Sequence, residues 1–444
     1  MIRKCKRWLV CVMVWVLVVT EVTMPVQAQA PEHSELYAKA AVLMDAASGR
    51  VLYEKNGQEI LAMASTTKIL TCIIALENAD LDEWVEVSAY ASTMPKVKLY
   101  IKKGEKYRLG DLLYSLMLES HNDVAVAIAE HLGKEFLEKE LQEKSVAEYT
   151  TKESKAAVAA FAGLMNEKAS QLGCENSWFI TPNGLDATET FTKEDGMSFF
   201  KNHSTTATDL ATIMSYCVLH SPKREQFLEI TQTISHSFAS MAGRNFFCTN
   251  HNAFLTMMEG AISGKTGFTN QAGYCYVGAL EQDGRTYVVA LLACGWPNNK
   301  SYKWSDTKKL MTYGVEEFVF HAFEEAAGNV QVPEKLPVFD GQTGYIGQQA
   351  YVQTGITATE AEGERFGEIE GLLLSGEEEI EVSCDMVSGL QAPVYEGDVI
   401  GTITYEVEGV CYKKEDIYLK NSVPKVDFQW CIRAILEKYM CGFW

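Results

Sequence analysis

A serine and a lysine three residues apart are the first candidates for chemistry. In the segment MASTTKILT, residues 63–71, Ser65 is followed by Lys68 and then by an apolar run. If a helix begins at Ser65, the two side chains lie on one face, one turn apart. A serine hydroxyl becomes a good nucleophile when a base takes its proton, and lysine can serve if burial and a nearby cation lower its pKa. The alternative is a helix cap with a surface lysine behind it.

The spacing alone discriminates poorly between these interpretations. It occurs four times, but only the first copy opens a continuous apolar segment. A lysine at the start of a buried helix needs a functional reason, because an unpaired buried charge is costly. The four copies begin at Ser65, Ser198, Ser305 and Ser422.

The segment SHN, residues 120–122, occurs once and follows an apolar helical segment. Ser120 can relay protons there, and the Asn122 amide can orient both the lysine and a substrate amide. The alternative is a polar turn whose Ser or Asn caps the next helix.

The segment KTG, residues 265–267, is also unique and precedes a β-rich segment, so we expect it on an edge strand. Lys265 and Thr266 can bind a substrate carboxylate, and Gly267 allows a substrate backbone to approach. Its alternative is an ordinary start of a strand. The three motifs together, each in suitable surroundings, favour a catalytic site over three unrelated local features.

The elements that must position these motifs follow from periodicity and turn residues. Apolar runs predict strands, three- and four-residue spacings predict helices, and the charge-dense segment 134–157 predicts a solvated helical insertion. The expected elements are a hairpin at 40–53, helices at 66–79, 109–132 (a pair) and 157–172, a hairpin at 273–295 and a helix at 305–326.

The composition changes near residue 330. Short Val, Ile, Thr and Tyr runs with Gly turns predict a small all-β domain at 329–422, in which the glutamates at 377–381 form a solvated hairpin edge. The segment 423–444 has apolar residues at spacings of three and four, interrupted by charges. It predicts an amphipathic helix that lies on a membrane surface, or alternatively one that docks on the protein itself.

The N-terminus predicts export. A basic patch, about a dozen apolar residues and an Ala-Gln-Ala end make residues 1–30 a signal peptide, with an uncleaved anchor as the alternative. This leaves a catalytic domain at 31–328 and a location at the outer face of the cytoplasmic membrane or in the cell wall. The formal net charge of −20 argues against nucleic-acid binding. The eight His and scattered Cys residues suggest no metal cluster, and no cofactor is predicted.

The order SxxK, SxN, KTG is the set found in penicillin-binding proteins and class A β-lactamases. The chain resembles the low-molecular-mass penicillin-binding proteins, the D-alanyl-D-alanine carboxypeptidases of the S11 serine peptidase type. The resemblance covers about residues 36–420. Further segments in family order are AAVLMDAASGRVLYEKN, MNEKASQLG, TPNGLD, HSTTATDLA, DTKKLMTYG and APVYEGDVIGTI.

The resemblance implies the α/β (α+β) serine β-lactamase and penicillin-binding-protein-like transpeptidase fold, followed by a small all-β domain. It implies that Ser65 attacks the carbonyl between two D-alanines of a peptidoglycan stem peptide, with Lys68 as base and with Ser120 and Asn122 in the catalytic set. The backbone N–H of Ser65 and one from the strand after Lys265 would form the oxyanion hole. β-Lactams would acylate the same serine.

The resemblance implies that Lys265 and Thr266 bind the terminal carboxylate of the substrate, with Gly267 beside them in the substrate-binding set. The sequence departs from the family at Lys303, where an arginine is usual, so a bidentate contact becomes a point charge. It also departs at His121, where a small residue is usual, so the ring would narrow the cleft or add a titrating group. The charged insertion at 134–157 has no evident counterpart.

Two other functions share these motifs. A class A β-lactamase would hold its deacylating water on a glutamate. The sequence has no convincing segment of that kind, and the extra β domain argues against this class. A penicillin sensor or inactive scaffold would be acylated without turnover, and it would carry signalling or membrane-crossing segments that the sequence lacks.

Overall fold

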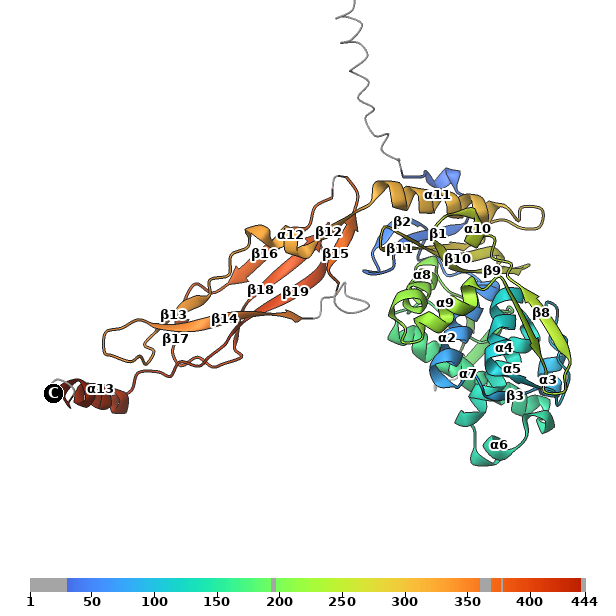
Figure 1. The fold of residues 1–444 in the computed structure, drawn as a ribbon, viewed down its shortest axis with the longest axis horizontal. Helices are drawn as coiled ribbons and strands as arrows, with labels where there is room; N and C mark the ends of the chain where they lie inside the picture. Colours follow the sequence, from blue (N-terminus) through green and yellow to red (C-terminus); the bar gives the residue numbers. More distant parts are fainter. Residues whose placement is uncertain (1–29, 193–196, 360–368, 377, 441–444) are drawn as a thin grey trace, which may run out of the picture.

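The computed structural model describes residues 30–192, 197–359, 369–376 and 378–440. Figure 1 shows a mixed α and β domain, a long β domain and a separate terminal helix. The predicted signal peptide falls almost wholly outside the described residues.

A five-stranded antiparallel sheet, in the order β2-β1-β11-β10-β9, forms the centre of the first domain. The hairpins predicted at 40–53 and 273–295 are confirmed, and the KTG segment lies on edge strand β9 as predicted. The strands are β1 (Ala40–Asp45), β2 (Val51–Lys55), β9 (Ala261–Thr269), β10 (Gly273–Gln282) and β11 (Arg285–Leu292).

Helices cover both faces of this sheet, which is why every residue of β1 is buried. Val42 and Met44 face the larger core, whereas Ala41 and Leu43 face a second core under α11. The larger core is built with α2 (Lys68–Asn78), α4 (Leu109–Tyr114), α5 (Asn122–Gly133), α7 (Thr151–Gln171), α8 (Ala207–Ser215) and α9 (Arg224–Gln232). The second core is closed by α10 (Phe254–Met257) and α11 (Tyr302–Glu317).

Smaller elements surround these layers. Two-stranded ribbons are formed by β3 (Trp84–Glu86) with β4 (Lys106–Arg108), β5 (Thr188–Thr192) with β6 (Ser198–Asn202), and β7 (Ser235–Ala239) with β8 (Asn245–Thr249). Short helices and turns are η1 (His33–Glu35), η2 (Ala64–Thr67), α3 (Ala89–Ser92), η3 (Ser115–Glu119), η4 (Lys134–Phe136), α6 (Lys139–Glu143), η5 (Val146–Glu148) and η6 (Tyr216–His220).

The charged segment 134–157 is helical, as predicted, but it differs from the solvated insertion that we expected. It contains η4, α6 and η5, and then the start of α7. The helix predicted at 157–172 begins earlier, at Thr151, because Thr150 and Glu153 form a capping box. Val146 and Tyr149 are buried in a small cluster, so the segment is not solvated throughout.

The helix predicted at 305–326 is also wrong at its C-terminal end. Helix α11 ends at Glu317, and the chain continues as strand β12 (Val319–Ala322). β12 pairs with β15 (Gly371–Leu374) of the C-terminal domain, so tertiary pairing overrides the local helical pattern.

The predicted all-β C-terminal domain is confirmed as a six-stranded sheet in the order β16-β18-β19-β14-β13-β17. Its apolar face packs with the β12–β15 ribbon and a short helix, α12 (Phe323–Ala326), which is followed by η7 (Ala327–Asn329). The strands are β13 (Lys335–Phe339), β14 (Ala350–Thr359), β16 (Glu381–Met386), β17 (Leu390–Gln391), β18 (Val399–Val407) and β19 (Val410–Leu419).

One glutamate of the predicted solvated edge has a structural partner. Glu378 forms an ion pair with Arg50, which follows the turn between β1 and β2, and both side chains are largely buried. Arg50 also donates to the backbone carbonyl of Leu373 on β15. These contacts hold the β domain against the first domain, so the acidic cluster is partly interfacial.

The last described element is α13 (Phe428–Met440), at the end of the β domain away from the first domain (Figure 1). Its apolar side chains are not covered: Phe428 is 78% exposed, Ile432 is 44% exposed and Ile435 is 45% exposed. The side chain of Tyr439, and Phe443, which belong to the predicted apolar face, lie outside the described part. Among the helices that the structure describes, none has the length and apolarity needed to cross a bilayer.

Candidate active site

Ser65 lies in a 3-10 turn, η2, immediately before the buried helix α2. The helix therefore begins at Lys68 and not at Ser65, although the turn still places both side chains together. The preceding residue, Ala64, has a left-handed backbone with φ of 49°. A non-glycine residue in that region costs roughly 1–2 kcal/mol, so the surrounding structure must hold this turn.

Two glycines allow other segments to approach that turn. A Cβ on Gly184 would lie 2.0 Å from the Ala64 carbonyl oxygen, and Gly184 itself has φ of 80°. A Cβ on Gly267 of β9 would lie 2.9 Å from the Ser65 amide nitrogen. Glycine at these positions therefore allows the 183–184 turn and the edge strand to contact the backbone of the serine.

Lys68 is completely buried and forms the centre of a hydrogen-bond network. Its Nζ lies 2.9 Å from Ser65 Oγ and 3.0 Å from Asn122 Oδ1, and it also donates to the backbone carbonyl of Asn183. The predicted serine–lysine pair is thus in contact, with the predicted asparagine beside it.

The SHN segment forms the turn between two helical elements. The π-helical turn η3 ends at Glu119, Ser120 takes a left-handed conformation with φ of 65°, and α5 begins at Asn122. This sharp turn directs Ser120 into the cleft and Asn122 toward Lys68. It also places Ser120 Oγ 3.0 Å from Lys265 Nζ on β9.

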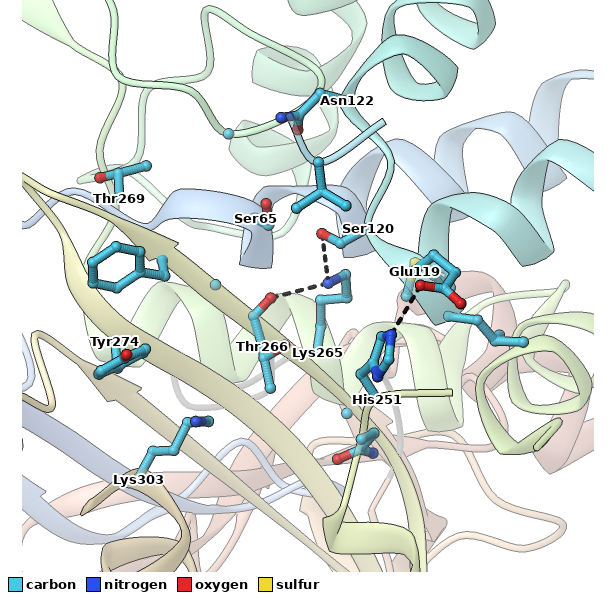
Figure 2. A pocket seen from close by; sticks show the side chains of 18 of the residues that line it. Ser65, Glu119, Ser120, Asn122, His251, Lys265, Thr266, Thr269, Tyr274 and Lys303 are labelled. Atoms are coloured by element: carbon cyan, nitrogen blue, oxygen red, sulfur yellow. Dashed lines mark hydrogen bonds and ion pairs between the residues drawn. The ribbon is translucent and has the colours of Figure 1, made fainter. Parts of the chain in front are cut away.

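Figure 2 shows Ser65, Ser120, Lys265 and Thr266 facing one another across a cleft. The cleft has a volume of about 580 Å³, and its walls include Gly267 and Lys303. Lys265 Nζ also donates to the Thr266 carbonyl at 2.9 Å. In the described ranges, no cluster of three or more His, Cys, Asp or Glu residues is arranged to hold a metal ion.

Burial lowers the pKa of both lysines of the cleft, and Lys265 also acts on Lys68. Burial lowers the pKa of Lys68 well below its usual value, and the charge of Lys265 lowers it further, while Asp123 opposes this shift. Burial also lowers the pKa of Lys265 to about 7. Desolvation thus favours the neutral, proton-accepting form of Lys68.

Lys303 lies in the wall of the cleft but apart from the two networks. Its Nζ donates to the Lys300 carbonyl at 2.8 Å and lies 4.9 Å and 4.6 Å from the ring centroids of Tyr274 and Trp304. Within the described residues, it shares no hydrogen bond with the other predicted site residues. Burial, with a smaller contribution from Lys300, lowers its pKa to about 8.

His121 does not narrow the cleft. Its ring lies behind the turn, where Nδ1 is 2.8 Å from the buried Ser115 hydroxyl, and it is not among the residues that line the cleft. Burial lowers the pKa of this histidine. An imidazole that does line the cleft is that of His251, 2.8 Å from the Glu119 carboxylate (Figure 2).

Sequence reasoning missed two residues whose hydrogen bonds position the site. The carbonyl of Asn183 accepts from Lys68, although TPNGLD was noted only as a family segment. The buried carboxylate of Asp123 accepts from the backbone amides of Leu99 and Ile101, at 2.9 Å and 3.2 Å. The sequence signal for both is their position: Asn183 precedes a turn glycine, and Asp123 directly follows the SHN segment.

Comparison with known proteins agrees with this geometry. The family model described as D-alanyl-D-alanine carboxypeptidase, peptidase S11, matches residues 25–139 and 145–293. A second model, the C-terminal domain of penicillin-binding protein 5, matches residues 375–425. The first match is interrupted only at 140–144, a shorter stretch than the charged insertion that we predicted.

Three similar proteins cover both domains or the first alone. A D-alanyl-D-alanine carboxypeptidase of Bacillus subtilis is 24% identical over 399 residues, which cover 88% of this chain and 87% of the relative. One from Mycobacterium tuberculosis is 31% identical over 256 residues, which cover 57% of this chain and 74% of the relative. The structure of penicillin binding protein 5 from Haemophilus influenzae shares the fold, with a TM-score of 0.62, 21% identity and coverage of 89% and 99%.

The fold and the motif order define a serine peptidase of the penicillin-binding-protein class. Within that class, the chain belongs to the D-alanyl-D-alanine carboxypeptidase family, peptidase S11, whose model matches more than half of its residues.

Proposed function

We propose that this enzyme removes the terminal D-alanine from peptidoglycan stem pentapeptides through an acyl-enzyme on Ser65. The contact of 2.9 Å between Lys68 Nζ and Ser65 Oγ, at a cleft that also holds Lys265, carries the proposal. Ser65 Oγ bonds to the carbonyl carbon of the penultimate D-alanine, and the bond from that carbon to the leaving nitrogen breaks. The oxygen of a water molecule then bonds to the same carbonyl carbon, the ester bond to Ser65 Oγ breaks, and a proton from the water returns to Oγ.

The partners of Lys68 support its role as the base. A neutral amine has two N–H bonds and one lone pair, and the oxygens of Asn183 and Asn122 near Nζ can only accept hydrogen bonds. They take the two N–H bonds and leave the lone pair for the Ser65 hydroxyl. The lowered pKa of Lys68 favours this neutral form.

The second network supports the departure of the leaving group. Ser120 Oγ accepts from Lys265 Nζ, so its own proton is available to the leaving amine. The terminal carboxylate of the substrate binds Lys265 and Thr266, with Lys303 adding positive charge from the cleft wall. Gly267 keeps β9 close to Ser65, whose amide and one from the strand stabilise the developing oxyanion.

The direct test is the release of free D-alanine from a pentapeptide that ends in D-Ala-D-Ala. We expect release by the mature protein and none by Ser65→Ala, with Ser198→Ala, a serine of the same SxxK spacing on β6, as the matched control. Absence of release by the unchanged protein, or undiminished release by Ser65→Ala, would sink the proposal.

Penicillin chemistry separates the two rival functions. We expect β-lactams to acylate Ser65 and to leave slowly. Fast turnover of a penicillin by the purified protein would favour a β-lactamase, whereas acylation without D-alanine release would favour a sensor or scaffold. The hydrogen bonds of Lys68 with Ser65 and of Lys265 with Ser120 favour an active hydrolase over a scaffold.

We further propose that the enzyme works outside the cytoplasm and that α13 attaches it to the membrane surface. The exposed apolar side chains of α13 and the charges of Arg433 and Lys438 suit a helix that lies in the interface. Deletion of residues 428–444 tests this, because the cut leaves the β-domain contacts of Lys425 and Val426 in place. Retention of the cleaved, truncated protein in the membrane fraction would contradict the attachment.

A further inference from the structure

We propose that the loop at residues 340–349, here called the tip loop, is a second lipid-contacting element beside α13. The inference rests on the proposed attachment of α13 to the membrane and adds a partner surface on the β domain. The tip loop connects β13 to β14 at the end of the domain where α13 begins (Figure 1).

Backbone hydrogen bonds join the tip loop to the segment that leads into α13. Val426 N donates to the Asp340 carbonyl, and Gln342 N donates to the Pro424 carbonyl, each at 2.8 Å. Gly341 forms a β-bridge with Lys425, and the side chain of Gln342 donates to the carbonyl of the same lysine at 2.8 Å. A helix that starts from this segment and lies on a membrane therefore brings the tip loop to the same surface.

The composition of the tip loop suits the lipid interface. Asp340 is its only charged residue, and three glycines keep it slim. Two consecutive apolar side chains, Tyr345 and Ile346, are 70% and 52% exposed. Tyrosine is enriched where membrane and water meet, because its ring is apolar and its hydroxyl is polar.

A neighbouring loop extends the same surface. Tyr395 is 60% exposed. The preceding residue, Val394, forms a β-bridge with Val423, just before the segment that leads into α13. Phe339, which ends β13 immediately before the tip loop, is 55% exposed. Large apolar side chains thus gather around the start of α13, although exposed apolar groups are usually scattered singly.

The occupant that fits this surface is a lipid bilayer and not a second copy of the chain. The formal net charge of −20 makes two copies repel each other. An amphipathic helix beside the loops already presents Phe428 and Ile435 to the outside. Since the tip loop has little charge, its contribution should be apolar and should persist on vesicles without anionic lipid.

The test compares vesicle binding of full-length mature variants. Tyr345→Ser combined with Ile346→Ser should weaken binding to phosphatidylcholine vesicles on the order of tenfold, because two partly inserted side chains are lost. The matched control is Val410→Ser, which is 48% exposed at the start of β19, at the other end of the sheet. Both variants should release D-alanine at the unchanged rate, since neither position contacts the cleft.

Deletion of residues 428–444 is the reference that separates the two proposals. A tenfold loss in the double variant, with a greater loss in the deletion variant, supports the tip-loop contact. If the deletion abolishes binding but the double variant binds like the unchanged protein, the tip-loop inference is overturned and the α13 attachment stands. If neither change weakens binding, both fail. Conversion of a dimer to a monomer by the double variant, at unchanged vesicle binding, would assign the surface to a second copy instead.

Discussion

The catalytic cleft and the surface formed by the tip loop and α13 depart from the usual burial of side chains in opposite directions. In the cleft, the ionisable side chains of Lys68 and Lys265 are buried, and Ala64 and Ser120 have left-handed backbones. At the tip, large apolar side chains such as Tyr345 are exposed. Each exception is unfavourable in the free protein.

The two kinds of exception suit two kinds of ligand. A buried pair of lysines favours an incoming carboxylate and a neutral base, whereas exposed aromatic and aliphatic groups favour an apolar phase. Since local rules are typically broken where function requires it, both regions are expected to carry function. Changes in the cleft should therefore alter catalysis without altering membrane binding, and changes at the tip should do the reverse.

The largest effect is expected at Lys68. Lys68→Ala removes the base, and Lys68→Arg introduces a positive charge that cannot be deprotonated, so both should slow acylation by a labelled penicillin about 10²- to 10⁴-fold. The control is Lys155→Ala, an exposed lysine on α7. Fast acylation of the arginine variant would show that charge, and not proton transfer, is the contribution of Lys68.

The next effect is expected at Gly267. An alanine there would bring its Cβ to 2.9 Å from Ser65 N and 3.0 Å from Ala64 Cβ, so β9 must move away from the serine. Because the oxyanion donors would separate, we expect kcat for D-alanine release to fall on the order of 10²-fold. Gly163→Ala is the control, because nothing lies within 4 Å of its added Cβ. Equal kcat values in the two variants would contradict the close approach.

A smaller effect is expected at Asp123. Asp123→Asn can accept only one of the amide hydrogen bonds from Leu99 and Ile101, so the segment beside Asn122 loosens and kcat/KM should fall roughly tenfold. Because the Asp123 charge raises the pKa of Lys68, its removal should move the acidic limb of kcat/KM to lower pH. The pH profile of kcat/KM measures this shift.

A merely structural role for Asp123 would lower the rate without moving that limb. Asp186→Asn provides a comparison, because its carboxylate bonds the Thr269 hydroxyl outside the Lys68 network. A shift of the acidic limb to higher pH in Asp123→Asn would contradict the electrostatic argument.

The contacts that sequence reasoning could predict are those carried by spaced side chains. Ser65 and Lys68 are one turn apart in any helical conformation, and the apolar run after them requires burial. The β9–β10–β11 meander follows from alternating β-rich runs and a turn at Gly284. In contrast, the Asn183 carbonyl contacts Lys68 through backbone, and backbone groups leave little trace in residue type.

The boundary between the domains shows a second limit. The segment at 319–322 has a local pattern compatible with a longer helix, but it pairs with β15 some fifty residues later. The Glu378–Arg50 ion pair joins still more distant segments. Such long-range partners decide structure where local propensity is weak, so the C-terminal end of α11 and the partly interfacial glutamate cluster could not be predicted from local patterns.

The smallest effect is expected at Lys303, a buried cation of the cleft that lies outside both networks. Burial lowers the pKa of Lys303 to about 8, so Lys303 loses its charge as the pH rises through that value. Lys265 loses its charge at a lower pH, because burial lowers its pKa to about 7. Since both charges favour the substrate carboxylate, KM should rise in two steps with pH.

The variant Lys303→Arg keeps its charge and should therefore lack the step near pH 8. At neutral pH the substitution should change KM only a few-fold. Lys309→Arg, further along α11, is the control. If KM follows the same pH profile in Lys303→Arg and the unchanged enzyme, Lys303 does not contribute to carboxylate binding, and its burial belongs to the packing of Tyr274 and Trp304.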